Sequence, residues 1–399
     1  MANEYLDKLK DEDGNSHPLH DSRISDDDIS NWTRKQNSLQ SGLDLKINGN
    51  TIQVDAQLKS GTTRGSLAFA EGDNIEASGD SSHAEGGTTA ATAACSHAEG
   101  CETKATNAQT HSEGYKTIAS GECAHAEGND TEASGKQSHA EGFDGIASGE
   151  CSHAEGAKTQ ALGTSSHAEG GVSVAYGKDS HAEGFNSTTR EYKLKDGGSE
   201  MTVSDWEPLD ANTTQTDTSY NFAQHAEGYT TIAGGIASHA EGQVTKAFGK
   251  NSHAEGLSTT AFGEECHTEG VSTQAGGKYC HAEGASTYVT GEASHVEGRG
   301  GGTTTNNVDI PTVKATGLGC HSEGRGTYSS GNGCHAEGDI LEYKKSDDTY
   351  AVISNTSNGY GCHAEGAGTY AGSTGAHAEG SADDGTYGDL VGQKVSARS

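Results

Sequence analysis

A tetrapeptide, His-Ala-Glu-Gly with small variations, recurs with a fixed step of 14 residues through most of this 399-residue chain. Its copies begin at His83, His97, His111, His125, His139, His153, His167, His181, His225, His239, His253, His267, His281, His295, His321, His335, His363 and His377. A degenerate copy begins at Phe69, one step before His83. A short fixed period is typical of solenoids, in which each repeat forms one coil.

Each repeat divides into two halves of seven residues that both follow Ser/Thr-x-Ala-x-Gly, as in Thr131 to Gly135 and then Ser138 to Gly142. Alternation of small and other residues predicts short strands, and the closing glycine permits a bend with positive φ. We therefore expect an all-β fold, a parallel β-solenoid of 14-residue coils with two strands and two bends each. Nineteen such coils would form a shaft about 90 Å long.

The composition agrees with a thin solenoid and excludes other classes. The chain has a net charge of −32, 58 glycines and 30% hydrophobic residues, which by composition alone would indicate disorder. Such a chain cannot build a large aliphatic core or a membrane span, and it lacks the basic face of a nucleic-acid binder. In a narrow coil, small residues fill the interior, and backbone hydrogen bonds between neighbouring coils supply the stability.

The two halves of the repeat differ in what their outward positions tolerate. The x positions of the first half vary, for example Glu132 and Ser134 or Ile146 and Ser148, whereas those of the second half are fixed as His and Glu. If Ala points inward, an outward position that never varies must pack against something, and a second copy of the chain is the natural candidate. We expect a homotrimer with charge-assisted His–Glu pairs near its axis. The alternative places His and Glu inside the coil and Ala at the interface.

The predicted trimer-interface ladder includes His83, Glu85, His97, Glu99, His125, Glu127, His139, Glu141, His153, Glu155, His239, Glu241, His253 and Glu255. Stacked imidazoles at the strand spacing would repel one another if protonated, so we expect neutral His, or His that shares charge with Glu. Acidification should then loosen the shaft. A His-x-Glu pair could also bind a transition metal, with His139, His153 and His167 as weak candidates. Because the pair recurs in every coil, we favour structural packing and predict no metal and no cofactor.

The nine cysteines are interpreted as small residues rather than a disulfide framework. Cys266, Cys280, Cys320, Cys334 and Cys362 take the Ser place before His, Cys95, Cys123 and Cys151 lie one residue earlier, and Cys101 follows a Gly. Their odd number and the absence of an apolar N-terminal signal fit folding in a reducing cytoplasm.

Three insertions interrupt the 14-residue step and define the expected organisation. The predicted parts are a polar segment 1–23, a short helix and β-hairpin over 24–66, roll over 67–184, a hairpin insertion 185–222, roll over 223–298, an insertion 299–318, roll over 319–338, a hairpin insertion 339–360, and the roll end with a tail over 361–399. The helix would be capped near Asp26, and Asn48-Gly49-Asn50 is a hairpin signal. Insertions in solenoids often project from a binding face, although they can equally cover the roll or brace neighbouring chains.

The Ser-x-Ala-x-Gly half-repeat resembles the head domain of trimeric autotransporter adhesins. The Ser-His-Ala-Glu-Gly form, as at Ser138 to Gly142, resembles bacteriophage tail-fibre and appendage proteins, some of which precede a peptidase G2-type chaperone autoprotease. The resemblance covers about residues 67 to 381, nearly 80% of the chain. It implies a left-handed trimeric β-roll on a virus particle. It also implies that Ser399 is the end left by self-cleavage of a longer precursor, the alternative being a chain that ends there naturally.

We therefore expect a structural virion fibre or appendage, on tail or capsid, that attaches to the host surface. The predicted receptor contacts, to a host glycan or protein, are Tyr192, Trp206, Tyr220, Tyr343 and Tyr350, and the predicted residues for docking to another virion protein are Tyr5, Leu6, Leu9 and Leu19. The first alternative is a bacterial trimeric surface adhesin. The second is a fibre that degrades polysaccharide, with Asp205, Glu207 and Asp210 as the candidate carboxylates, but we expect no enzymatic activity in these residues.

Overall fold

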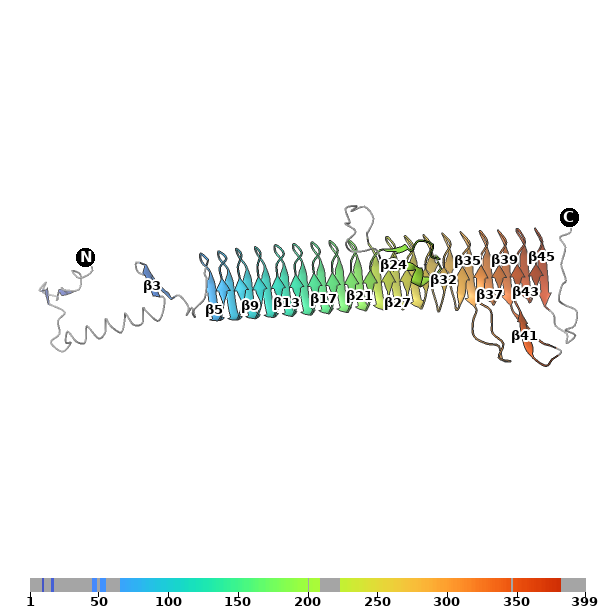
Figure 1. The fold of residues 1–399 in the computed structure, drawn as a ribbon, viewed down its shortest axis with the longest axis horizontal. Helices are drawn as coiled ribbons and strands as arrows, with labels where there is room; N and C mark the ends of the chain where they lie inside the picture. The colour runs from blue at the N-terminus through green and yellow to red at the C-terminus, as the bar shows by residue number, and fades with distance from the viewer. Residues whose placement is uncertain are drawn as a thin grey trace.

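The chain forms a long, straight parallel β-solenoid, seen from the side in Figure 1. The computed structural model describes residues 65–199, 201–208, 223–345 and 347–381, together with the backbone of four short strands between residues 9 and 54. In the described roll, one sheet runs through 19 long strands and a second through 18 short strands. The predicted β-solenoid of 14-residue coils is confirmed.

The long strands begin at the His of each repeat and carry the tetrapeptide. They are β5 Phe69–Asp73, β7 His83–Gly87, β9 His97–Cys101, β11 His111–Tyr115, β13 His125–Asn129, β15 His139–Phe143, β17 His153–Ala157, β19 His167–Gly171, β21 His181–Phe185, β25 His225–Tyr229, β27 His239–Gln243, β29 His253–Leu257, β31 His267–Thr268, β33 His281–Ala282, β35 His295–Arg299, β37 His321–Arg325, β39 His335–Asp339, β43 His363–Ala367 and β45 His377–Ser381. Each pairs in parallel with the next, His opposite His, and this register continues across all three insertions.

The short strands form the opposite wall of the coil. They are β6 Glu76–Ala77, β8 Ala90–Ala91, β10 Lys104–Ala105, β12 Ile118–Ala119, β14 Glu132–Ala133, β16 Ile146–Ala147, β18 Gln160–Ala161, β20 Val174–Ala175, β22 Thr188–Thr189, β26 Ile232–Ala233, β28 Lys246–Ala247, β30 Thr260–Ala261, β32 Gln274–Ala275, β34 Thr287–Val289, β36 Val313–Ala315, β38 Tyr328–Ser329, β42 Thr356–Ser357 and β44 Tyr370–Ala371. Their parallel pairing is also in register, as in Ile146 opposite Gln160.

The interior of the coil is built from the small residues of both halves. Ala140 and Ala147 are fully buried, as is Thr131, while His139 and Glu141 are half-buried on the outside. Ser138 is also buried, and its hydroxyl donates a hydrogen bond to the Gly135 carbonyl oxygen at 2.7 Å. This bond gives the carbonyl group of the turn a partner inside the coil. The prediction that Ala points inward is confirmed, and the alternative with His and Glu inside is wrong.

The expectation that a closing glycine supplies positive φ is confirmed for the second half-repeat, as at Gly142 (φ 101°), but not for the first, where Gly135 and Gly149 lack it. Each bend also contains a left-handed residue that is mostly not glycine, such as Asp144 (φ 54°) and Cys151 (φ 56°). Such a conformation costs about 1 kcal/mol for a residue with a side chain. Here it is offset because the left-handed residues of the later coils donate their N–H to the coil before, as Asp144 does to the Asn129 carbonyl oxygen at 2.9 Å.

Glycine is required in each coil for a different reason, close approach between coils. A Cβ on Gly149 would overlap the carbonyl oxygen of Gly163 in the next coil. Gly142, inside the long strand, meets the same obstacle against Gly156 and also has a φ of 101°. These two glycine positions therefore set how tightly the coils stack, although Ala93, Asn107 and Ser373 replace the first of them in three coils.

The first insertion lies along the roll. Its hairpin consists of β23 Tyr192–Leu194 and β24 Trp206–Pro208, with a 3-10 turn, η1 Val203–Asp205, between them. Trp206 stacks on Phe248 with ring centroids 5.1 Å apart, and Tyr192 contacts the same ring. Phe248 and Phe262 occupy variable x positions of the first half-repeat, and this packing buries both of them. Of the two expectations for an insertion, projection from the roll and cover over it, the structure shows cover for residues 192–194 and 201–208, because aromatic packing holds them against the short strands.

The second and third insertions leave the roll on the other side (Figure 1) and touch each other. The third contains the hairpin of β40 Leu341–Lys344 and β41 Tyr350–Ile353, and Thr304 of the second donates a hydrogen bond to Glu342 at 2.6 Å. All three insertions are shorter than predicted. The roll strands β22, β36 and β42 lie within the predicted bounds of 185–222, 299–318 and 339–360.

The N-terminal part contains two short antiparallel pairs. β3 Leu45–Asn48 pairs with β4 Thr51–Val54, which confirms the predicted hairpin, and β1 Leu9–Lys10 pairs with β2 Ser16–His17. The predicted helix near Asp26 lies outside the described residues, as does Ser399.

Candidate functional site

The histidines of the long strands form one continuous stack along the shaft, which with the neighbouring glutamates we call the His–Glu ladder. Every His from His83 to His377 stacks on the next, with centroids 4.5 to 4.9 Å apart and interplanar angles of 1° to 11°. Phe69 takes the first place and meets His83 edge-on at 5.1 Å. The stack follows from the in-register parallel pairing, which places identical residues at the spacing of neighbouring strands.

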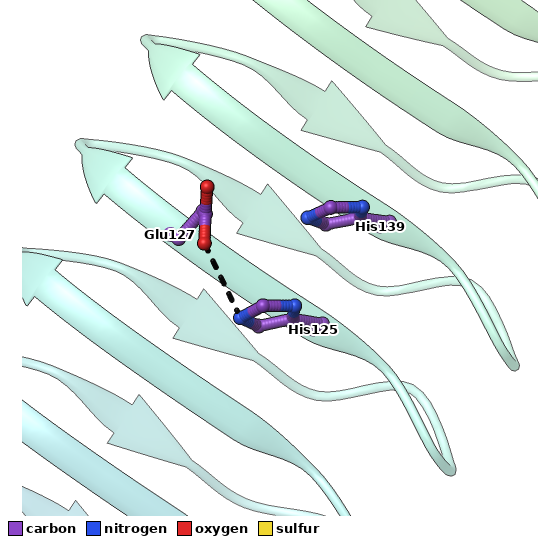
Figure 2. Close-up of side chains that lie close together, drawn as sticks. All are labelled: His125, Glu127 and His139. Carbon is purple, nitrogen blue, oxygen red and sulfur yellow. Dashed lines mark ion pairs between the residues drawn. The ribbon is translucent and has the colours of Figure 1, made fainter.

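Each glutamate lies between two imidazoles, one in its own coil and one in the next. Figure 2 shows Glu127 beside His125, with the parallel ring of His139 one coil further. Within a coil the Nε2–Oε2 distance is 3.5 to 3.8 Å, for example 3.7 Å for His125 and Glu127. Between coils His267 reaches Glu255 at 3.1 Å, the hydrogen-bonded pair among the described ladder residues. Within one chain, most of the expected charge-assisted His–Glu pairs are therefore contacts longer than a hydrogen bond.

The stack favours neutral histidine. Burial, and then the charge of the neighbouring rings, lowers the pKa of His125 and His139 from the ordinary value. The pKa moves in the same direction for His97, His167, His239, His281, His295 and His335. This direction agrees with the expectation of uncharged imidazoles, since protonation would place like charges on adjacent rings.

If the histidines are neutral, the negative charges of glutamates in neighbouring coils are not balanced by positive charges beside them. Hydrogen bonding with Glu127, together with burial, raises the pKa of Glu141 to about 7. Hydrogen bonding with Glu141 lowers the pKa of the next carboxyl, Glu155. Burial raises the pKa of Glu283 to about 7 as well. Ionisation of one carboxyl therefore opposes ionisation of the next along the column, as expected of like charges held in close register.

Two histidine nitrogens and one glutamate oxygen lie near one another at several places along the ladder, and these groups include all three weak candidates from the sequence. His139 belongs to the group with His125 and Glu127, and His153 and His167 belong to a group with Glu155, the ligand atoms of each group lying within 4.8 Å of one another. Imidazole nitrogen and carboxylate oxygen are a donor set that divalent transition metals accept.

A third outward column beside the ladder was missed from the sequence. The residue after the Gly of the tetrapeptide shares the face of His and Glu, because it is the next alternate position on the same strand. In six coils it is a large apolar residue, 40 to 51% exposed: Tyr115, Phe143, Phe185, Tyr229, Leu257 and Val271. Phe185 and Tyr229 stack with centroids 5.5 Å apart. The available signal was the recurrence of apolar residues at this one position of the repeat.

The structure places the predicted receptor contacts in different surroundings. Tyr192 and Trp206 pack against the roll, whereas Tyr343 and Tyr350 lie on the third hairpin, with Tyr350 exposed. Tyr220 lies outside the described residues, as do the docking candidates Tyr5, Leu6 and Leu19, while Leu9 lies in β1.

Two of the carboxylates considered for catalysis have structural partners. Asp205 accepts a hydrogen bond from the Ser199 backbone N–H at 2.9 Å, and Glu207 pairs with Lys193 at 3.3 Å across the hairpin. Asp210 lies outside the described residues.

The cysteines occupy two kinds of place. All nine are free thiols, with Cys266, Cys280, Cys320, Cys334 and Cys362 buried and Cys95, Cys101, Cys123 and Cys151 exposed. The buried ones fill the Ser column, as predicted, and Cys280 donates to the Gly291 carbonyl oxygen at 2.8 Å.

No family model matches the chain, and no curated protein matches it either. Within the described residues, no helix has the length and apolar character needed to cross a membrane. The class that fold and site define is a β-solenoid repeat protein with a histidine-rich 14-residue coil.

Proposed function

We propose that this chain is the shaft of a bacteriophage fibre or appendage and assembles as a homotrimer through one face of its roll. That face, the long-strand face, comprises the His column, the Glu column and the column of Tyr115, Phe143, Phe185, Tyr229, Leu257 and Val271. The proposed role is structural, with host attachment through the insertions, and it assigns no reaction to the chain.

The observation that carries the self-association is the exposed apolar column beside the ladder. Exposed apolar residues gathered in one place mark interaction surfaces, whereas scattered ones need no explanation. Here six of them, 40 to 51% exposed, recur at one position of a straight rod. An identical rod offers the same spacing from coil to coil, so a second and third copy match the column along its whole length.

The virion location rests on the resemblance of the Ser-His-Ala-Glu-Gly repeat to phage fibre proteins. The rod is consistent with this role, because its length comes from repetition of coils that contact only their neighbours. In this proposal the N-terminal segment with Tyr5, Leu6, Leu9 and Leu19 docks to another virion protein. The hairpin carrying Tyr343 and Tyr350 is the part offered to a host glycan or protein.

Three experiments test the proposal. Light scattering combined with size-exclusion chromatography on the full chain should give three times the mass of one chain, and a monomer at micromolar concentration would overturn the trimer. Antibody labelling of purified phage particles, viewed by electron microscopy, should decorate a tail or capsid appendage. Labelling confined to the bacterial surface would favour the adhesin alternative instead. Release of sugars from host capsule would support the polysaccharide-degrading alternative and contradict a purely structural role.

A further inference from the structure

The ladder contains an unusual number of buried nitrogen atoms without a hydrogen-bond partner. Among the described ladder histidines, 16 have an Nε2 that is shielded from solvent and makes no hydrogen bond, His125 and His139 among them. Buried polar atoms in native proteins nearly always have a partner, because an unpaired one costs about 1–3 kcal/mol. Repetition of the same unpaired atom in coil after coil indicates a ligand that each coil could bind.

The atoms next to these nitrogens are carboxylate oxygens at a distinctive separation. Nε2 and Oε2 of one coil lie 3.5 Å apart for His83 and Glu85 and 3.6 Å apart for His181 and Glu183. These distances exceed an ordinary hydrogen bond. They suit two ligands of one metal ion, since donors at about 2.1 Å from zinc and at a tetrahedral angle are about 3.4 Å apart.

The stacking decides which atoms can share an ion. Parallel rings 4.5 to 4.9 Å apart direct their Nε2 lone pairs side by side, so two histidines of adjacent coils cannot converge on one ion. The Glu of the same coil can, because His and Glu occupy alternate positions on one face of one strand. A site therefore takes one His and one Glu, and its remaining positions are open to water.

We propose that the His–Glu ladder is a linear array of binding sites for divalent transition-metal ions such as zinc, one site for each His-x-Glu pair. The mixed nitrogen and oxygen ligands favour these ions over magnesium and calcium, which prefer oxygen alone. Ions in adjacent coils would lie about 4.8 Å apart and repel each other, so alternate coils fill first, giving about nine ions per chain. Both protein ligands of a site come from one chain, so the array is proposed independently of the trimer.

The test uses the full chain, produced without an affinity tag and stripped with a chelator. His17 and His20, which lie outside the repeat, are replaced by Asn in every sample. After dialysis against micromolar zinc, elemental analysis should find several zinc ions per chain, and cobalt in place of zinc should give the visible absorption of a nitrogen-ligated ion. Less than one zinc per chain, or displacement of zinc by an equal concentration of magnesium, would overturn the proposal.

Matched variants separate coordination from attraction of cations to a negatively charged rod. E127Q, E141Q and E155Q together remove three ladder carboxylates, whereas E102Q, E132Q and E150Q remove three exposed carboxylates elsewhere on the coils with the same change in charge. The ladder variant should lose about one to three bound zinc ions, as expected when a ligand is removed from a mononuclear site, and the control should lose none. Equal losses from both would overturn the proposal.

A second variant retains the shape of the stack while removing the nitrogen ligands. Phe69 already occupies the His position of the first described coil, so H125F, H139F and H153F place in the ladder a ring that the roll tolerates. Circular dichroism confirms folding, and zinc content should fall as in the Glu variant. The mass of the assembly is measured on the same samples. Zinc content therefore tests the metal array and the mass tests the trimer, so failure of one proposal is distinguished from failure of the other. Unchanged zinc in a folded His variant would overturn the proposal.

Discussion

The two faces of each coil share one backbone but tolerate very different side chains. On the short-strand face, outward positions change from Glu132 to Ile146 to Gln160 in successive coils. On the long-strand face, His and Glu recur in coil after coil. Where the first insertion covers the short strands, that face too becomes specific, with Phe248 and Phe262 under Trp206. The comparison teaches that outward positions vary where nothing packs on them and become apolar where the hairpin covers them, and the proposed trimer extends this rule to the long-strand face.

The largest effect on stability is expected from a substitution at the glycine of the long strand, which contacts the next coil. Gly156→Ala places a Cβ against the carbonyl oxygen of Gly170 at a φ of 109°, and neither backbone can move without breaking the register. We expect a loss of about 4 kcal/mol or more in the free energy of unfolding, seen as a large fall in melting temperature by circular dichroism. Gly87→Ala is the control, because its Cβ would enter open space. Similar melting of the two variants would contradict this account of stacking.

The next effect distinguishes the faces by self-association. Replacement of Tyr115, Phe143 and Phe185 by Ser removes apolar area from the long-strand face, which should weaken assembly about 100-fold if each side chain contributes about 1 kcal/mol. Ile118, Ile146 and Val174, replaced by Ser on the short-strand face, form the control. Sedimentation across a dilution series measures both. Equal weakening by the two sets would remove the distinction between the faces.

A smaller effect concerns the part of the short-strand face that is covered. Trp206→Ala removes the ring stacked on Phe248 and should lower stability by about 2 kcal/mol, less than for a fully buried Trp. The hairpin should also become open to proteolysis near Tyr192, whereas Trp206→Phe should retain most of the protection. Unaltered cleavage of the Ala variant would show that the hairpin is held in another way.

The smallest effect is a pH dependence of the ladder, measured in chelator-treated protein. The pKa of Glu141 is raised to about 7 by Glu127 and by burial, so its stabilising contribution is present below its unfolded value and is lost as pH rises through 7. Glu141→Gln, which stays neutral beside Glu127, Glu155, His139 and His153, should therefore melt about 1–2 °C higher than the native chain at pH 8. The difference should shrink as pH falls from 7 and vanish below pH 4.5, the ordinary value of the pKa of Glu.

The lowered pKa of His125 and His139 acts in the opposite sense. Their stabilising contribution is present above the unfolded pKa and is lost as pH falls through the folded one, which loosens the shaft in acid.

Glu132→Gln, on the short-strand face, is the control for the Glu141 variant and should show no pH-dependent difference. If Glu132→Gln raised the melting temperature as much as Glu141→Gln does, the effect would come from net charge alone.

Most of the fold was predictable because the repeat carries it. The 14-residue step gives the coil, and the alternation around Ala133 and Ala140 gives the inward and outward positions. The same alternation identified the His–Glu ladder but not the apolar column at Phe143, because that position varies among coils and shows its character only when the coils are stacked. Positive φ was placed correctly at the glycine of the tetrapeptide, such as Gly142, but it was not foreseen at residues such as Cys151, which adopt it with a hydrogen bond to another coil.

The sequence by itself determined the period, the two-strand coil and the small-residue interior, because these depend on local alternation repeated at a fixed step. Only the tertiary structure decided that the first hairpin lies on Phe248, that Thr304 joins two insertions, and that the ladder nitrogens lack hydrogen-bond partners. Those features depend on distances between residues far apart in the chain or in different coils. No pattern within a single repeat encodes them.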